Sequence, residues 1–137
     1  MNFALDTNVC IALINGTSEQ VRKRFDRALA SKHELFLSSI VTFELWYGVF
    51  RSTRVRFNSD RLEAFLEGPV TILHFDEDDA RAAGVVNAAL RARGNLIGGY
   101  DTLLAGQAID KDLTLVTSNI SEFSRIKGLA CQDWARV

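Results

Sequence analysis

Four short apolar runs, separated by segments with helical spacing of their apolar residues, constrain the fold of this chain more than any other feature. The runs are FALD (3–6), ELFLSS (34–39), VTILHF (70–75) and LTLVTS (113–118), and a last short strand is expected within LACQDW (129–134). Strands that are apolar almost throughout are typical of a parallel sheet covered on both faces. We therefore predict a three-layer α/β architecture with a mainly parallel central sheet of about four to five strands and helices on both faces.

Length and composition set the class of protein. The chain has 137 residues and no repeat or linker, so residues 1–137 are expected to form a single domain. It lacks an apolar run of membrane-spanning length and a basic signal-peptide region, which favours a cytoplasmic protein. Cys10 and Cys131 have no CxxC spacing and no histidine cluster beside them, so we interpret them as small core residues.

The charge balance excludes a protein that holds nucleic acid by bulk charge, because the net charge is −1. Any contact with nucleic acid must come from local basic patches, although each patch alone is more typical of a solvated helix face. The candidate patches are Arg22, Lys23, Arg24 and Arg27; Arg51, Arg54, Arg56 and Arg61; and Arg91 with Arg93.

Polar residues follow the expected strands at the points where the strands end. Asp6 ends the first run, Glu44 lies early in the helix after the second, and Asn119 comes just after the fourth. Asp101 lies near the start of a helix that follows two glycines in IGGYDTLLAGQA. Because ligands bind at the carboxyl ends of strands in such sheets, we expect all four side chains at one edge.

Three carboxylates and an amide at one edge repel one another unless a cation or shared protons neutralise them. All candidate ligand atoms are oxygens and neither histidine is near, so Mg²⁺ or Mn²⁺ fits better than zinc or copper. Such an ion supports hydrolysis of a phosphate ester. Taken singly, Asp6 is more typical of a helix cap, Asp101 of a helix-dipole charge and Asn119 of a turn. Glu44 is harder to explain this way, because it interrupts an otherwise apolar segment.

The order and spacing of these motifs resemble those of the PIN-domain ribonucleases, particularly the toxins of VapBC-type toxin–antitoxin pairs. The resemblance rests on LDTNV, FELWYG, IGGYDTLLAGQA and LTLVTSNISEFSRIKGL followed by DW, and runs from Phe3 to Trp134. It implies a PIN-like fold and a metal-dependent endoribonuclease, usually with Mg²⁺ or Mn²⁺. It also implies a cognate antitoxin that covers the site, an RNA substrate and a homodimer.

The resemblance also implies roles for individual residues. Asp6, Glu44 and Asp101 match the acidic metal ligands, and Asn119 is the fourth residue of the candidate catalytic set. The expected mechanism is in-line attack of metal-bound water on an RNA phosphodiester. Thr7, Asn8 and Thr117 are the supporting polar residues. Arg125, in the EFSRI turn, is the first candidate for a phosphate contact, with an ordinary surface salt bridge as its alternative.

One position departs from the family pattern, because Asn119 stands where many relatives have an aspartate. An amide oxygen can bind a metal ion but adds no negative charge, which leaves open whether the site holds a second metal ion. Glu122, further along the same loop, is a candidate to supply the missing negative charge, although its position is more typical of a solvated loop residue. We predict that Asn119→Ala weakens activity less than Asp101→Asn.

Two alternatives to the ribonuclease remain open on the sequence. One is a nuclease that acts on DNA or structured nucleic acid. The other is a degenerate PIN domain that binds partners without cutting, which the amide at Asn119 favours. A receiver-like domain fits less well, since the chain lacks the acidic pair and the phosphoacceptor aspartate in the required places.

Four aromatic residues crowd one expected helix, in FELWYGVF. We expect at least half of Phe43, Trp46, Tyr47 and Phe50 to lie in the core. The remainder would line a homodimer surface or a groove for an antitoxin segment, since aromatic residues are favoured interface anchors.

Overall fold

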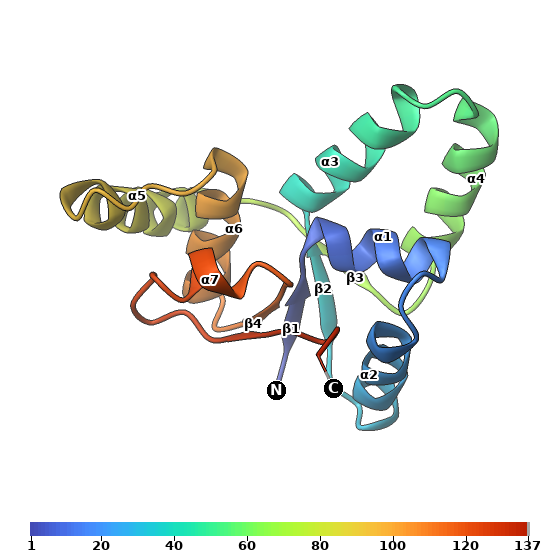
Figure 1. Cartoon of the computed structure of the whole chain (residues 1–137), viewed down its shortest axis with the longest axis horizontal. Helices are drawn as coiled ribbons and strands as arrows, with labels where there is room; N and C mark the ends of the chain where they lie inside the picture. Colours follow the sequence, from blue (N-terminus) through green and yellow to red (C-terminus); the bar gives the residue numbers. More distant parts are fainter. Residues whose placement is uncertain (137) are drawn as a thin grey trace.

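A five-stranded parallel sheet forms the centre of the molecule, in a computed structural model that describes residues 1–136 (Figure 1). The strand order is β3-β2-β1-β4-β5, and every pairing is parallel. The strands are β1 (Phe3–Leu5), β2 (Leu35–Ser38), β3 (Thr71–Leu73), β4 (Thr114–Val116) and β5 (Cys131–Gln132). The predicted α/β class, the parallel sheet and the strand number are confirmed.

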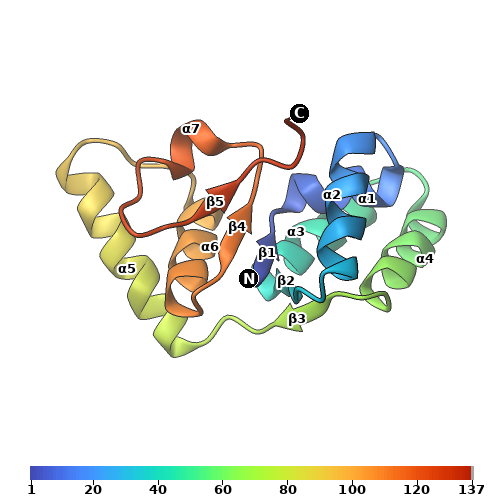
Figure 2. The same ribbon diagram turned by 90° about the horizontal axis from the view of Figure 1, so that it is seen from below.

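Seven helices cover the sheet within residues 1–136. They are α1 (Thr7–Asn15), α2 (Glu19–Ala30), α3 (Ser39–Phe50), α4 (Val55–Leu66), α5 (Glu77–Ala92), α6 (Gly99–Asp110) and α7 (Ile120–Phe123). Helices α1 to α4 gather on one side of the sheet and α5 to α7 on the other, as the two views together show (Figures 1 and 2). No helix in the described part of the chain has the length and apolar character needed to span a membrane.

Alternate residues of the central strand enter two different cores, because successive side chains of a strand point to opposite faces. Phe3 and Leu5 pack with α1 to α4, whereas Ala4 packs on the cluster beneath α5 to α7. The same alternation separates Leu37 from Phe36 in β2. These two cores explain why the strands are apolar on both faces.

The two helices that cover the second core approach each other unusually closely. A Cβ atom at Gly106 in α6 would lie 2.4 Å from the Ala83 Cα in α5, a distance that real Cβ atoms do not reach. Glycine at this position therefore permits the packing of α6 on α5. This contact fixes α6, which carries Asp101 at its other end.

The helix boundaries follow the local signals in the sequence. Asp76 and Asp79, three residues apart in the sequence, form a capping box at the start of α5. Gly94 follows the end of α5 with φ +69°, a conformation that suits a residue without a side chain. Cys10 is fully buried in the first core and Cys131 is partly buried, and both are free thiols.

The expectation that at least half of the four aromatic residues of α3 lie in the core is wrong. Phe43, Tyr47 and Phe50 are exposed, and only Trp46 is half-buried. The core face of α3 is made by Val41, Leu45 and Val49, which recur every four residues. The aromatic residues fall on the other faces of the helix.

Candidate active site

The ends of β1 and β4 and the starts of α3 and α6 carry the predicted polar residues. Asp6 directly follows β1 and caps α1, and Glu44 lies in the second turn of α3. Asp101 lies in the first turn of α6, and Asn119 lies between β4 and α7. All four come from the carboxyl side of the parallel sheet, where sheets of this type bind ligands.

Asp6 is held by hydrogen bonds at both of its carboxylate oxygens. The backbone N–H of Thr7 donates to Oδ1 at 2.7 Å, and Thr117 Oγ1 donates to Oδ2 at 2.7 Å. The Asp6 side chain and Thr117 are both buried. The end of β4 thus fixes the carboxylate at the end of β1.

Thr7 connects two of the carboxylates. Its backbone binds Asp6, and its hydroxyl donates a 2.8 Å hydrogen bond to Glu44 Oε1. Glu44 is half-buried, so this bond satisfies part of a carboxylate in an otherwise apolar helix. One threonine therefore orients the side chains of two different elements.

The electrostatic environment of Asp101 shows that the carboxylates lie close together. Its pKa is raised to about 6, first by burial and then by the negative charges of Asp6, Glu122 and Glu44. A hydrogen bond from Asn119 acts in the opposite direction. Within residues 1–136, no lysine or arginine forms an ion pair with these carboxylates. The cluster is therefore a group of oxygen ligands without a protein counter-charge.

Glu122 belongs to this group, contrary to its interpretation as a solvated loop residue. It is half-buried in α7, and its Oε2 accepts a 2.8 Å hydrogen bond from Asn119 Nδ2. Residues three apart share a helix face, so the short helix α7 turns Glu122 back over Asn119. Two features of the sequence indicate this arrangement: the three-residue spacing of Asn119 and Glu122, and the apolar Phe123 after them, which is fully buried.

Two of the predicted residues lie outside this network. Asn8 is exposed on α1, and in the described chain no hydrogen bond joins its side chain to the cluster. Arg125 is exposed, and its backbone carbonyl accepts a hydrogen bond from the Arg93 guanidinium. His33 lies 3.2 Å from the terminal amine of Met1, away from the carboxylates.

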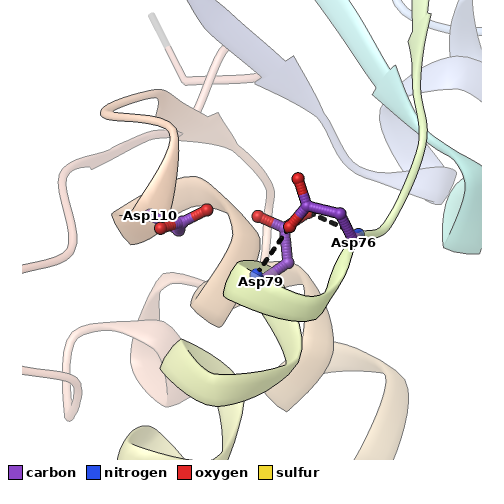
Figure 3. A group of neighbouring side chains, drawn as sticks. All are labelled: Asp76, Asp79 and Asp110. Carbon is purple, nitrogen blue, oxygen red and sulfur yellow. Dashed lines mark hydrogen bonds between the residues drawn. The ribbon is translucent and has the colours of Figure 1, made fainter.

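A second acidic cluster lies at the opposite end of α6, and it has its own cation. Oxygens of Asp76, Asp79 and Asp110 lie within 4.8 Å of one another (Figure 3). Lys111 Nζ lies 2.6 Å from Asp76 Oδ2, 3.0 Å from Asp110 Oδ2 and 3.4 Å from Asp79 Oδ1. The lysine occupies the place that a metal ion would take, so this cluster joins α5 to α6.

An apolar groove runs beside the carboxylates, between α1 and the α3–α4 hairpin. It encloses about 220 Å³, and Glu44 is one of its lining residues. Its apolar walls include Ile11, Ile14, Leu45, Val49 and Leu62. A partner in this groove would contact a member of the acidic cluster.

Comparison with known proteins identifies the family. The model of the PIN domain matches residues 3–129. The chain belongs to the PIN domain family. The resemblance drawn from the sequence motifs is thereby confirmed, and the described acidic cluster lies in a PIN fold.

Its relatives include named nucleases of similar length. The chain is 35% identical to the tRNA(fMet)-specific endonuclease VapC of Salmonella typhimurium, and 36% identical to the ribonuclease VapC2 of Rickettsia felis. Each match covers 98% of both chains. A solved structure of VapBC2 from Rickettsia felis, bound to a DNA fragment from the promoter, has a chain with TM-score 0.91 and 34% identity. That match covers 98% of this chain and 99% of the other.

Proposed function

We propose that this PIN domain is a metal-dependent endoribonuclease and the toxin of a toxin–antitoxin pair. The observation that carries the proposal is the linked set of Asp6, Glu44 and Asp101 at the carboxyl edge of the sheet, with Glu122 beside them. The names of its full-length relatives, which are ribonucleases or endonucleases, support the same reaction. We further propose that residues 1–137 form one domain, of which the family model covers 3–129.

The donor set fits a hard divalent cation. It consists of carboxylate oxygens and one amide. Burial and then the neighbouring carboxylates raise the pKa of Asp101, and a bound cation would favour its charged form and relieve the repulsion. We assign Asp6 and Asp101 as the main ligands, with Glu44 and Glu122 completing the set directly or through water. When bound, Mg²⁺ or Mn²⁺ would activate water and stabilise charge on the phosphate.

The remaining residues of the network hold these ligands in place. The Thr7 backbone N–H and the Thr117 hydroxyl each donate one hydrogen bond to a different Asp6 oxygen, which leaves further lone pairs of both oxygens for a cation. Thr7 orients Glu44, and Asn119 orients Glu122. In this assignment Asn119 is a positioning residue, and Glu122 supplies the negative charge that the amide lacks.

The partner proposal rests on the groove beside Glu44. The solved complex from Rickettsia felis pairs a VapC chain with VapB, which supports an antitoxin partner for this chain. We propose that the antitoxin inserts an apolar segment between α1 and the α3–α4 hairpin. Because Glu44 lines that groove, a bound segment would contact this member of the acidic cluster.

Cleavage of a mixed RNA pool tests the function directly. The purified chain is assayed with Mg²⁺, with Mn²⁺ and with EDTA, beside an identically prepared Asp101→Asn variant that exposes contaminating nucleases. We expect metal-dependent RNA cleavage that the variant lacks, and weaker or no cleavage of DNA of the same sequence. Equal traces from both folded proteins would instead favour the degenerate PIN domain that binds without cutting.

A further inference from the structure

Two exposed aromatic rings flank the acidic cluster at the mouth of the site. Phe43 immediately precedes Glu44 in α3, and Tyr100 immediately precedes Asp101 in α6. Their rings meet edge to face, with centroids 5.5 Å apart and an interplanar angle of 63°. Phe43 is 51% exposed and Tyr100 49%, so each ring keeps about half of its surface open to solvent.

The aromatic surface continues along α3 away from the carboxylates. Tyr47 is 62% exposed and lies one helical turn beyond Phe43, on the same face of the helix. The Arg51 guanidinium lies 5.7 Å from the centre of the Tyr47 ring. We call Tyr100, Phe43, Tyr47 and Arg51 the aromatic track. From Phe43 to Arg51 it spans eight residues of one helix face, about 12 Å.

The far end of the aromatic track carries unpaired positive charge. Arg51, Arg54 and Arg56 are exposed, and in the described chain none of them forms an ion pair. Arg54 stacks on Phe57 with its guanidinium 4.0 Å from the ring centre. Guanidinium groups held on aromatic rings are suited to contacts with phosphates and nucleobases.

A single-stranded polyanion matches this surface better than an apolar partner does. Aromatic rings bind the faces of successive bases, while arginines bind the phosphates between them. Such contacts also offset a difficulty of the site, because an anionic substrate must approach a cluster of carboxylates. The aromatic track begins at that cluster and leads to the arginines.

We propose that the aromatic track binds single-stranded RNA and sets which phosphate reaches the carboxylates. A base stacks on Phe43 and Tyr100 beside the scissile phosphate, the neighbouring base stacks on Tyr47, and Arg51 contacts the phosphate beyond. The inference rests on the proposed ribonuclease function. In this inference the residues of the aromatic track bind and position the RNA, and the acidic cluster carries the chemistry.

Binding of short oligoadenylate to the Asp101→Asn protein tests the inference without cleavage. On that background, we expect Phe43→Leu and Tyr100→Leu each to weaken binding about tenfold, the range of one lost base stack. An abasic ribose-phosphate strand of the same length should bind all three proteins equally, because it has no base to stack. Val85→Ala, which alters an exposed apolar side chain on α5, is the matched control and should leave binding unchanged.

The charge at the end of the aromatic track is tested by salt dependence. Arg51→Gln should reduce the slope of log affinity against log salt by about 0.7, the value for one phosphate contact on a single strand. The aromatic variants should leave the slope unchanged. Arg81→Gln, at an exposed position of α5, is the charge control.

Light scattering and cleavage separate the possible failures. Phe43→Leu and Tyr100→Leu variants that bind oligoadenylate normally would overturn the inference. The same holds if light scattering shows that they lose only an oligomeric state, and this face would then be an interface with another copy of the chain or with another protein. That result would leave metal-dependent cleavage by the parent chain intact. Loss of both cleavage by the parent and RNA binding by Asp101→Asn would instead overturn the proposed function and the inference together.

Discussion

Thr117 Oγ1 donates a 2.7 Å hydrogen bond to Asp6 Oδ2, across 111 residues of sequence. Both side chains are buried, and the same hydroxyl accepts a 3.0 Å hydrogen bond from the Asn119 backbone. One side chain therefore joins the end of β1 to the segment that carries Asn119 and Glu122. The hydroxyl stabilises the fold and positions the candidate ligands at the same time.

Thr117→Val should destabilise the protein by about 1–3 kcal/mol, because it leaves a buried carboxylate oxygen without its donor. Metal-dependent cleavage should fall as well, since Asp6 loses its orientation. Urea unfolding and the RNA assay measure the two effects. Thr114→Val is the matched control, since Thr114 is buried at the start of β4, three residues before Thr117, but donates no hydrogen bond to the cluster; a similar loss there would contradict the role of Thr117.

The Asn119–Glu122 pair should act as one unit. We expect Asp101→Asn to reduce cleavage by at least about a hundredfold, and Asn119→Ala to reduce it less, because Asn119 acts by orienting Glu122 and by its hydrogen bond to Asp101. Glu122→Gln should cost at least as much as Asn119→Ala, and the double variant little more than Glu122→Gln alone. Additive losses, or equal losses for Asn119→Ala and Asp101→Asn, would show that Asn119 acts independently.

The raised pKa of Asp101, about 6, predicts a pH-dependent stability of the metal-free protein. Because the folded state binds this proton more tightly than the unfolded state, the contribution of Asp101 to stability falls as pH rises from about 4 to about 6. In EDTA, Asp101→Asn should therefore be more stable than the parent at pH 7, and this advantage should shrink near pH 4. Urea unfolding of both proteins at the two pH values provides the measurement.

Added Mg²⁺ is the control for that comparison, because a bound cation removes the repulsion in the parent. It should raise the stability of the parent at pH 7 and change the variant less. A parent that is as stable as Asp101→Asn at pH 7 in EDTA would show that neither burial nor the neighbouring carboxylates disfavour the charged form of Asp101 in the folded state.

Gly106→Ala should destabilise the protein by about 1–3 kcal/mol or more, because the new methyl group overlaps the α5 backbone at Ala83. The packing of α6 on α5 must then loosen, so cleavage should fall with it. Gly84→Ala provides the contrast within α5, since a Cβ there meets nothing within 4 Å and alanine favours a helix. Thermal unfolding should move in opposite directions for the two variants, and equal shifts would contradict the close-packing argument.

The sequence predicted those parts of the fold that local patterns specify. Strands that are apolar on both faces identify a covered parallel sheet, and the spacing of Asp76 and Asp79 identifies the start of α5. The direction of the parallel strands predicted that Asp6 and Asp101 lie at the same edge of the sheet. Helices α2 and α4 were not predicted individually, because their polar composition leaves only narrow apolar faces such as Val21, Phe25 and Ala28.

Features that depend on three-dimensional context were harder to predict. The position of Glu122 depends on a four-residue helix that turns it back to Asn119, and the same residues are also typical of a loop. The exposure of Phe43 and Tyr47 depends on which face of an almost wholly apolar helix meets the sheet. Hydrophobicity alone does not distinguish these faces.

The order of the elements along the chain affects when the site can exist. Asp6 and Glu44 come from the first fifty residues, but Asp101 and Glu122 come after residue 100, and β4 pairs directly with β1. A chain cut short before α6 lacks both Asp101 and Glu122, and one cut short before β4 still lacks Glu122 and the Thr117 hydroxyl that orients Asp6. The candidate site is therefore complete only when nearly the whole chain has been synthesised.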